Sequence, residues 1–210
     1  MVDSVTFWNR IAEKYARTPI ADMASYDYTL ERTAAHLKPG DRVLELGCGT
    51  GTTALRLAPK VAGIVVTDIA PAMLAVGRRK AAEQGVENVE FVEARAETPP
   101  EGTFDAVLAF NLLHLVDDLD ASLAAIHDRL KPGGLFISKT FCLSKGRNSL
   151  KLTLIRLALP VMQLLGKAPP VTFSTEAQLE RAITRAGFDL VEQESFPAKD
   201  PRRFLVARRR

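Results

Sequence analysis

Short apolar runs alternate with helical patterns along most of this chain. From about residue 41 onward, five apolar runs predict buried strands: Arg42–Leu46, Val61–Thr67, Val89–Val92, Phe104–Phe110 and Leu135–Thr140. Amphipathic stretches between them predict helices: Thr52–Leu57, Pro71–Gln84 and Leu119–Leu130. Strands that alternate with helices are typical of βαβ units, whose strands lie parallel in one sheet.

The last part of the chain predicts one more helix and two more strands. We expect Ser174 to be the N-cap of a helix that runs to about Ala186, with Gly187 as its stop in the left-handed conformation. Phe188–Phe196 and Arg203–Ala207 have the apolar character of strands. Because a short connection joins them, they should pair antiparallel.

The pattern predicts a single α/β domain over residues 1–210, with two segments outside the alternation. Residues 5–37 predict an N-terminal helical arm that is rich in aromatic residues. Residues 143–170 form an inserted segment that continues as a nearly uninterrupted apolar run. It begins with three basic residues, Lys145, Arg147 and Lys151. Three interpretations stay open for it: a lid over an apolar pocket, an interfacial helix at a membrane, or a dimer contact.

Composition indicates a folded globular protein, since 47% of the 210 residues are hydrophobic and 25% are charged. The formal net charge of +3 is too small to indicate a nucleic-acid partner. Part of the excess comes from arginines near the end of the chain, which we expect to be a solvated and frayed terminus: Arg202, Arg203, Arg208, Arg209 and Arg210.

The cysteines predict neither a metal site nor a disulfide framework. There are two, Cys48 and Cys142, and neither lies in a metal-ligand spacing, so a reduced, cytoplasmic setting is expected. The first residues lack the apolar region of a secretory signal, and no run of about 18 apolar residues predicts a spanning helix. We expect contact with a membrane, if any, to be peripheral and at its inner face.

A strand that leads into three alternate glycines is the sharpest chemical signal. Gly47, Gly49 and Gly51 follow the first strand, and glycine allows both a sharp turn and close approach of a ligand to the backbone. A dinucleotide site would have the third glycine one position later, to seat a pyrophosphate on a helix N-terminus. Glu45 precedes the turn, and a carboxylate is a poor neighbour for pyrophosphate but a good one for an ammonium group.

The second strand ends at Asp68, roughly 20 residues beyond the glycines. A carboxylate at that position can accept hydrogen bonds from both ribose hydroxyls of a nucleoside. The alternative interpretation is structural, with Asp68 as the N-cap of the helix that begins near Pro71.

Four motifs in order resemble those of the class I S-adenosylmethionine-dependent methyltransferases. They are Glu-Leu-Gly-Cys-Gly-Thr-Gly at 45–51, Asp-Ile-Ala-Pro-Ala-Met-Leu at 68–74, residues 104–114, and Leu-Lys-Pro-Gly-Gly at 130–134. The resemblance covers about residues 7–142 and 174–208, and is closest to the ubiquinone/menaquinone C-methyltransferases and related small-molecule enzymes. It implies a Rossmann-like fold with a mostly parallel seven-stranded sheet, a C-terminal antiparallel hairpin and helices on both faces.

The resemblance also implies roles for individual residues. The glycine turn would contact the methionine part of S-adenosylmethionine, Glu45 would order its amino group and Asp68 would hold the ribose. Ile69 and Met73 would flank the adenine, Asn111 and Leu112 would lie near the methionine end, and Tyr15 would close over the cofactor. The implied cofactor-binding set is Tyr15, Glu45, Gly47, Cys48, Gly49, Asp68, Ile69, Met73, Arg95, Ala96, Asn111 and Leu112.

One position departs from the family pattern. Where relatives often have Gly-Asp-Ala after the third strand, this chain has Ala94-Arg95-Ala96. An arginine side chain has donors and no acceptor, so Arg95 cannot receive a hydrogen bond from the adenine amino group. Glu97 or a backbone carbonyl is the candidate replacement.

The expected reaction is methyl transfer to a small, apolar or amphiphilic acceptor, with His114 as the candidate catalytic base. The alternative for His114 is a packed histidine, and His36 and His127 are predicted to be surface residues. Alternative functions are a membrane-associated lipid or quinone methyltransferase and a non-catalytic protein that binds S-adenosylmethionine.

Overall fold

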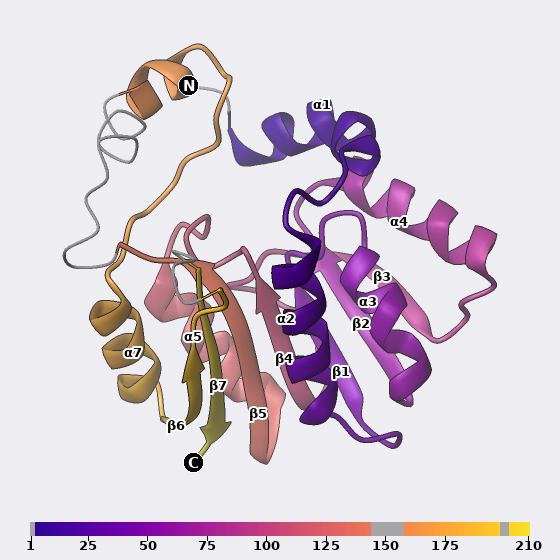
Figure 1. The fold of residues 1–210 in the computed structure, drawn as a ribbon, viewed down its shortest axis with the longest axis vertical. Helices are drawn as coiled ribbons and strands as arrows, with labels where there is room; N and C mark the ends of the chain where they lie inside the picture. Colours follow the sequence, from indigo (N-terminus) through magenta and orange to yellow (C-terminus); the bar gives the residue numbers. More distant parts are fainter. Residues whose placement is uncertain (1–2, 144–157, 198–201) are drawn as a thin grey trace.

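The computed structural model describes residues 3–143, 158–197 and 202–210. Its centre is a seven-stranded sheet in the order β3-β2-β1-β4-β5-β7-β6, with β7 antiparallel to both of its neighbours and the other pairs parallel (Figure 1). The strands are β1 Arg42–Leu46, β2 Gly63–Asp68, β3 Val89–Glu93, β4 Phe104–Phe110, β5 Leu130–Phe141, β6 Phe188–Glu194 and β7 Arg202–Arg209. The predicted fold class is therefore confirmed.

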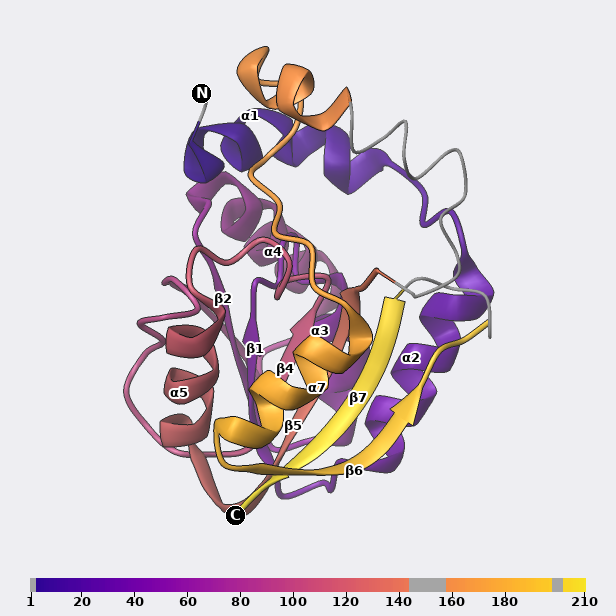
Figure 2. The ribbon, with the colours of Figure 1, turned by 90° about the vertical axis from the view of Figure 1, so that its left-hand side faces the viewer.

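Helices cover both faces of this sheet. They are α1 Ser4–Arg17, α2 Met23–Ala35, α3 Thr52–Leu57, α4 Pro71–Gln84, α5 Leu119–Arg129 and α7 Glu176–Arg185, with a short 3-10 turn η1 at Ala58–Lys60. Helices α2 and α3 lie on one face, and α5 and α7 lie on the other (Figure 2). Helix α1 packs on α4 beyond the edge of the sheet, and residues 158–164 are also helical.

The central strands bury both of their faces, which explains their continuous apolar character. In β1, Val43 packs in the cluster under α2 and α3, whereas Leu44 packs in the cluster under α5 and α7. Ala106 and Val107 divide in the same way in β4. Successive side chains of a strand point to opposite faces, so each apolar run supplies two cores at once.

Two predicted boundaries of elements were wrong. The N-cap of α7 is Thr175, one residue after the predicted Ser174, because Thr175 and Gln178 form a reciprocal capping box. Strand β5 begins at Leu130 rather than at the predicted Leu135, with an irregular register against β4.

The arginine-rich end is ordered rather than frayed. Strand β7 lies between β5 and β6, with Phe204 and Leu205 at 1% exposure or less. Arg203 pairs with Glu180, and Arg209 donates to the Leu130 carbonyl. Four consecutive apolar residues of β7, at positions 204–207, are buried, and this burial outweighs the local tendency of a charged terminus to fray.

The order of the strands places a site at one end of the sheet. The chain places β2 and β3 on one side of β1, and then reverses direction across the sheet to place β4 and β5 on its other side. Ligands of open α/β sheets bind outside the carboxyl ends of the strands at such a reversal. The residues after β1, β2 and β4 therefore converge on one place.

Candidate functional site

The glycine turn after β1 is held against β2 by two hydrogen bonds. Cys48 N donates to Thr67 O at 2.8 Å, and Gly49 N donates to a carboxylate oxygen of Asp68 at 2.9 Å. Gly47 has φ of 63°, and a Cβ there would lie 2.6 Å from Leu112 Cδ1. Gly49 has φ of 55° and an open side, since a Cβ there would meet only the Tyr15 ring, at 3.7 Å. The turn thus presents bare backbone to a cavity.

Asp68 lies at the tip of β2 and organises the backbone around it. Its second oxygen accepts from Ala70 N at 2.9 Å, and α4 begins after Ala70 without a side-chain cap. Asp68 is therefore not the N-cap of α4, and the structural alternative was wrong in that form. Burial raises the pKa of Asp68, while hydrogen bonds from the backbone of Ala70, Gly49 and Ile69 act in the opposite direction. Each carboxylate oxygen keeps a lone pair for a further donor.

Glu45 is a buried acid near the carboxyl end of β1, with 2% exposure. Its Oε2 has no hydrogen-bond partner among the described residues. The pKa of Glu45 is raised to about 8, chiefly by burial, against a hydrogen bond from the Ala54 backbone that lowers it and with a smaller contribution from the charge of Asp68. A buried acceptor that lacks a donor is costly, so this carboxyl group is suited to a cationic ligand.

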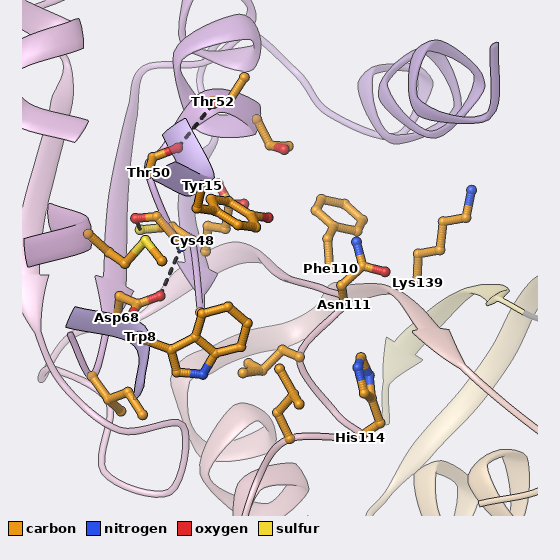
Figure 3. A pocket seen from close by; sticks show the side chains of 18 of the residues that line it. Trp8, Tyr15, Cys48, Thr50, Thr52, Asp68, Phe110, Asn111, His114 and Lys139 are labelled. Atoms are coloured by element: carbon orange, nitrogen blue, oxygen red, sulfur yellow. Dashed lines mark hydrogen bonds between the residues drawn. The ribbon is translucent and has the colours of Figure 1, made fainter. Parts of the chain in front are cut away.

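These groups line a cavity of about 920 Å³ at the carboxyl ends of the strands. Figure 3 shows Asp68 and Cys48 on one side of it, and Asn111, His114 and Lys139 on the other. All of the sequence-predicted residues lie on its walls: Tyr15, Glu45, Gly47, Cys48, Gly49, Asp68, Ile69, Met73, Arg95, Ala96, Asn111, Leu112 and His114. The structure thus brings the set together, while the role of each residue stays a prediction.

Helix α1 covers the side of the cavity next to α4. It is anchored on α4, because Ala72 N donates to Asn9 Oδ1 at 2.9 Å and Arg79 pairs with Glu13. Its Trp8 and Tyr15 rings meet edge to face, with centroids 6.2 Å apart, and both line the cavity. Tyr15 remains 51% exposed, so this wall lies at the cavity mouth.

The opposite wall carries polar groups that come from β4 and β5. Asn111 adopts φ of 53°, and its backbone N–H donates to Lys139 O at 2.6 Å. A non-glycine residue with positive φ is strained, and such strain concentrates at functional sites. His114 has Nδ1 3.2 Å from Thr140 Oγ1. Burial lowers the pKa of His114 to about 4, so its imidazole is neutral near pH 7.

Lys139 is a cavity residue that the sequence pattern did not predict. It is 4% exposed, and its Nζ donates to Ser25 Oγ at 2.7 Å and Thr29 Oγ1 at 2.9 Å on α2. The available signal was a lysine inside the apolar strand pattern of 135–140. Phe110, Tyr26 and Trp8 also line the cavity without having been assigned to it.

His36 and His127, which were predicted to be surface residues, are partly buried, and neither lines the cavity. His36 Nε2 is 2.8 Å from Glu192, and the His127 ring packs edge to face on Phe188. Cys48 is the cavity cysteine, and burial holds the pKa of its thiol well above the ordinary value. Among the residues that the structure describes, no cluster of potential ligands for a metal ion is found.

The inserted segment is described from residue 158, so Lys145, Arg147 and Lys151 lie outside the described residues. The described part is apolar and exposed, with Val161, Met162, Leu164 and Leu165 at 40–73% exposure. It is attached to α1 by a hydrogen bond from Arg10 to Gly166 O. It then reaches the cavity, where Pro169 and Val171 form part of the wall. No helix in the described part of the chain is both long and apolar enough to span a membrane.

Comparison with known proteins identifies the domain. Residues 43–134 match the methyltransferase domain family. The chain is 39% identical over 116 residues to the ubiquinone/menaquinone biosynthesis C-methyltransferase of Coxiella burnetii, covering 52% of this chain and 46% of that protein. The corresponding enzyme of Teredinibacter turnerae is 39% identical over 130 residues, covering 59% of this chain and 50% of that protein. The chain therefore spans about half the length of these curated relatives.

The fold agrees with these matches over nearly the whole chain. The geranyl diphosphate C-methyltransferase of Streptomyces coelicolor superposes with a TM-score of 0.75 at 14% identity, covering 99% of this chain and 100% of that one. Residues 43–134 thus match a methyltransferase domain, the chain is similar to ubiquinone/menaquinone C-methyltransferases over about half of their length, and its fold is that of a solved methyltransferase.

Proposed function

We propose that this protein transfers a methyl group from S-adenosylmethionine to a small acceptor that is apolar or amphiphilic. The observation that carries the proposal is the convergence of Glu45, the open backbone of Gly49 and the Asp68 carboxylate on one wall of a large cavity. A volume of about 920 Å³ is near the upper end for ligand sites, which leaves room for an acceptor beside a nucleoside.

The residues present fit the cofactor at three points. The unpartnered Glu45 Oε2 matches an ammonium donor, and the free lone pairs of Asp68 match two ribose hydroxyls. The open side of Gly49 gives room for a chain to lie against the backbone. When bound, S-adenosylmethionine supplies a methyl group on a sulfonium, which is already activated for transfer.

Catalysis by this chain is then largely a matter of positioning. Rigid placement of the nucleophile in line with the methyl group can contribute roughly 7–11 kcal/mol. Asn111, which is fixed by its bond to Lys139 O, and Leu112, which packs on Gly47, would shape the reacting end of the cavity. The apolar wall excludes water, and its members are contributed by distant segments: Trp8, Ile20, Met23, Phe110, Leu115 and Val171.

His114 is the candidate base for an acceptor that must lose a proton. Burial keeps its pKa near 4, so the imidazole is neutral at pH 7 and has a free lone pair, but it is a weak base unless a bound ligand raises this pKa. If the Nδ1 proton is donated to Thr140 Oγ1, the lone pair of Nε2 remains available. If Thr140 Oγ1 instead donates to Nδ1, the proton of the ring lies on Nε2, which is then a donor. His114 can therefore act as a base only in the tautomer with the proton on Nδ1.

A second candidate, a peripheral membrane enzyme with a lipid or quinone-like acceptor, is favoured by one specific observation. The exposed apolar residues Val161, Met162, Leu164 and Leu165 lie a few residues before Pro169 and Val171 of the cavity wall. Surface that is this apolar needs a cover, and a membrane would place an amphiphilic acceptor beside the opening.

Ligand binding followed by turnover tests the proposal. S-adenosylmethionine or S-adenosylhomocysteine at about 100 times its dissociation constant should stabilise the fold by roughly 2.7 kcal/mol, whereas NAD should not. Transfer of a radiolabelled methyl group to a panel of apolar phenols, quinols and lipids then tests the reaction. Stabilisation by NAD alone would overturn the cofactor assignment. Tight nucleoside binding without transfer to any acceptor would favour a non-catalytic binding protein.

A further inference from the structure

The segment after β3 places a charged arginine and a glutamate, Arg95 and Glu97, in the wall of the cavity. Arg95, at the position where relatives often have an aspartate, turns to Asp117 in the loop after β4 and pairs with it. The same guanidinium has Nε 3.6 Å from Glu97 Oε2. Arg95, Glu97 and Asp117 all line the cavity, so the pairs connect two of its walls.

This arrangement leaves one carboxylate oxygen without a donor. Glu97 Oε2 faces Arg95, whereas Oε1 is buried and has no hydrogen-bond partner among the described residues. The Glu97 side chain is only 18% exposed, whereas that of Arg95 is 50% exposed. Desolvating a carboxylate oxygen without a donor is costly, so a ligand group that donates here gains more than it would at an exposed acid.

Apolar side chains share the cavity lining with Glu97. Ala96 and Met73 are buried at 8% and 1% exposure, and Ile69 also lines the cavity. Asp68 ends β2 beside Glu93 of β3, and Ala94 N donates to its backbone carbonyl at 3.2 Å, so the segment that carries Glu97 begins next to Asp68. A ribose held by Asp68 would therefore present its base to this end of the cavity. The exocyclic amino group is the donor on the outer edge of adenine.

The geometry points to Glu97 as the residue that recognises the adenine amino group, with Arg95 holding its carboxylate in place. The assignment rests on the proposed function, because it presumes that the cavity binds an adenine nucleoside. Arg95 replaces the missing acceptor indirectly: it fixes Oε2 of Glu97 and leaves Oε1 for the ligand. Inosine carries a carbonyl oxygen instead of the amino group, and two acceptors would then face each other.

Calorimetry with paired ligands tests this inference. Wild-type protein is titrated with S-adenosylhomocysteine and with S-inosylhomocysteine, its deaminated analogue. A hydrogen bond to a charged group predicts a preference for the adenine compound on the order of ten- to hundredfold. In Glu97→Gln the amide can donate to the carbonyl oxygen, so the preference should fall to within a few-fold. Glu93→Gln, an exposed acid on β3 outside the cavity, is the matched control and should keep the wild-type preference.

The ratio of the two affinities separates recognition from a structural effect, which would weaken both ligands together. Equal affinity of the wild-type protein for both compounds overturns the assignment without any variant, and so does a full preference in folded Glu97→Gln. If the wild-type protein binds neither compound, the proposed function fails and the assignment fails with it. Binding of the adenine compound without the expected preference would leave the proposed function standing.

Discussion

Glu45→Gln is the substitution that most directly tests how the cavity meets a cation. Glu45 is 2% exposed, and burial raises its pKa to about 8. At pH 7 the carboxyl group is therefore protonated in about nine tenths of the ligand-free molecules. An ammonium group bound beside it favours the carboxylate, so ligand binding should lower this pKa and expel the proton.

The magnitude follows from the pKa difference. If the bound pKa falls well below 7, binding at pH 7 should release about 0.9 of a proton, and at pH 9 almost none. The proton is released on binding because the ligand-free protein holds it and the complex does not. Affinity should therefore rise with pH by up to about tenfold per unit below pH 8, and level off above it.

The assay is calorimetric titration with S-adenosylhomocysteine in buffers that differ in ionisation enthalpy, since the slope gives the number of protons exchanged. The ligand's own amino group titrates in both proteins, so the difference between wild type and Glu45→Gln isolates Glu45. The variant should bind more weakly and lose this proton release. Release that persists in Glu45→Gln would assign it to another acid, such as Asp68, and refute the reasoning. An unchanged affinity in the variant would show that the ammonium group lies elsewhere.

Three further substitutions have defined outcomes. Asp68→Ala should weaken binding of S-adenosylhomocysteine about 30-fold, as two ribose hydrogen bonds of about 1 kcal/mol each are lost, and an unchanged calorimetric affinity would place the ribose elsewhere. The pKa of His114 is about 4 when folded and higher when unfolded, so the unfolded chain binds the extra proton below about pH 6.5. The free energy of unfolding, from urea titrations, should therefore fall between pH 6.5 and 4 in the wild type and fall less in His114→Gln; equal slopes would contradict this. Leu164→Ser with Leu165→Ser should reduce co-sedimentation with anionic liposomes and leave nucleoside affinity within a few-fold, whereas the control Val191→Ser, at an exposed apolar site on β6, should change neither sedimentation nor affinity. No sedimentation of the wild-type protein would exclude the membrane version.

The cofactor side of the site was predictable because its residues follow strand ends in short motifs. Glu45 and Gly47 belong to β1 and its turn, and Asp68 ends β2. Parallel strands bring their carboxyl ends to one edge of the sheet. The sequence therefore predicted that these residues lie together, although it specifies no long-range contact between them. The positive φ of Gly47 and Gly49 is the conformation that the glycines indicate.

Other features depended on contacts that local patterns do not encode. Thr175 rather than Ser174 is the N-cap because its side chain accepts from Gln178 N while the Gln178 side chain accepts from Thr175 N, although serine is also a good capping residue. In the sequence, Lys139 only interrupts an apolar strand. Its burial in the cavity depends on partners on α2 that lie more than 100 residues earlier in the chain. The ordered strand β7 likewise depends on pairing with β5, which outweighs five nearby arginines.

The walls of the cavity come from two kinds of segment. The matched domain spans residues 43–134 and contains Glu45, Asp68 and His114, whereas much of the remaining wall comes from α1, α2, β5 and residues 169–171. Changes in those outer segments can alter the space beside the methyl group while the glycine turn and Asp68 stay as they are. Relatives that share the domain can therefore share the donor and differ in the acceptor. The experiments that identify the acceptor must act on these outer segments, because variants of the turn report on the donor alone.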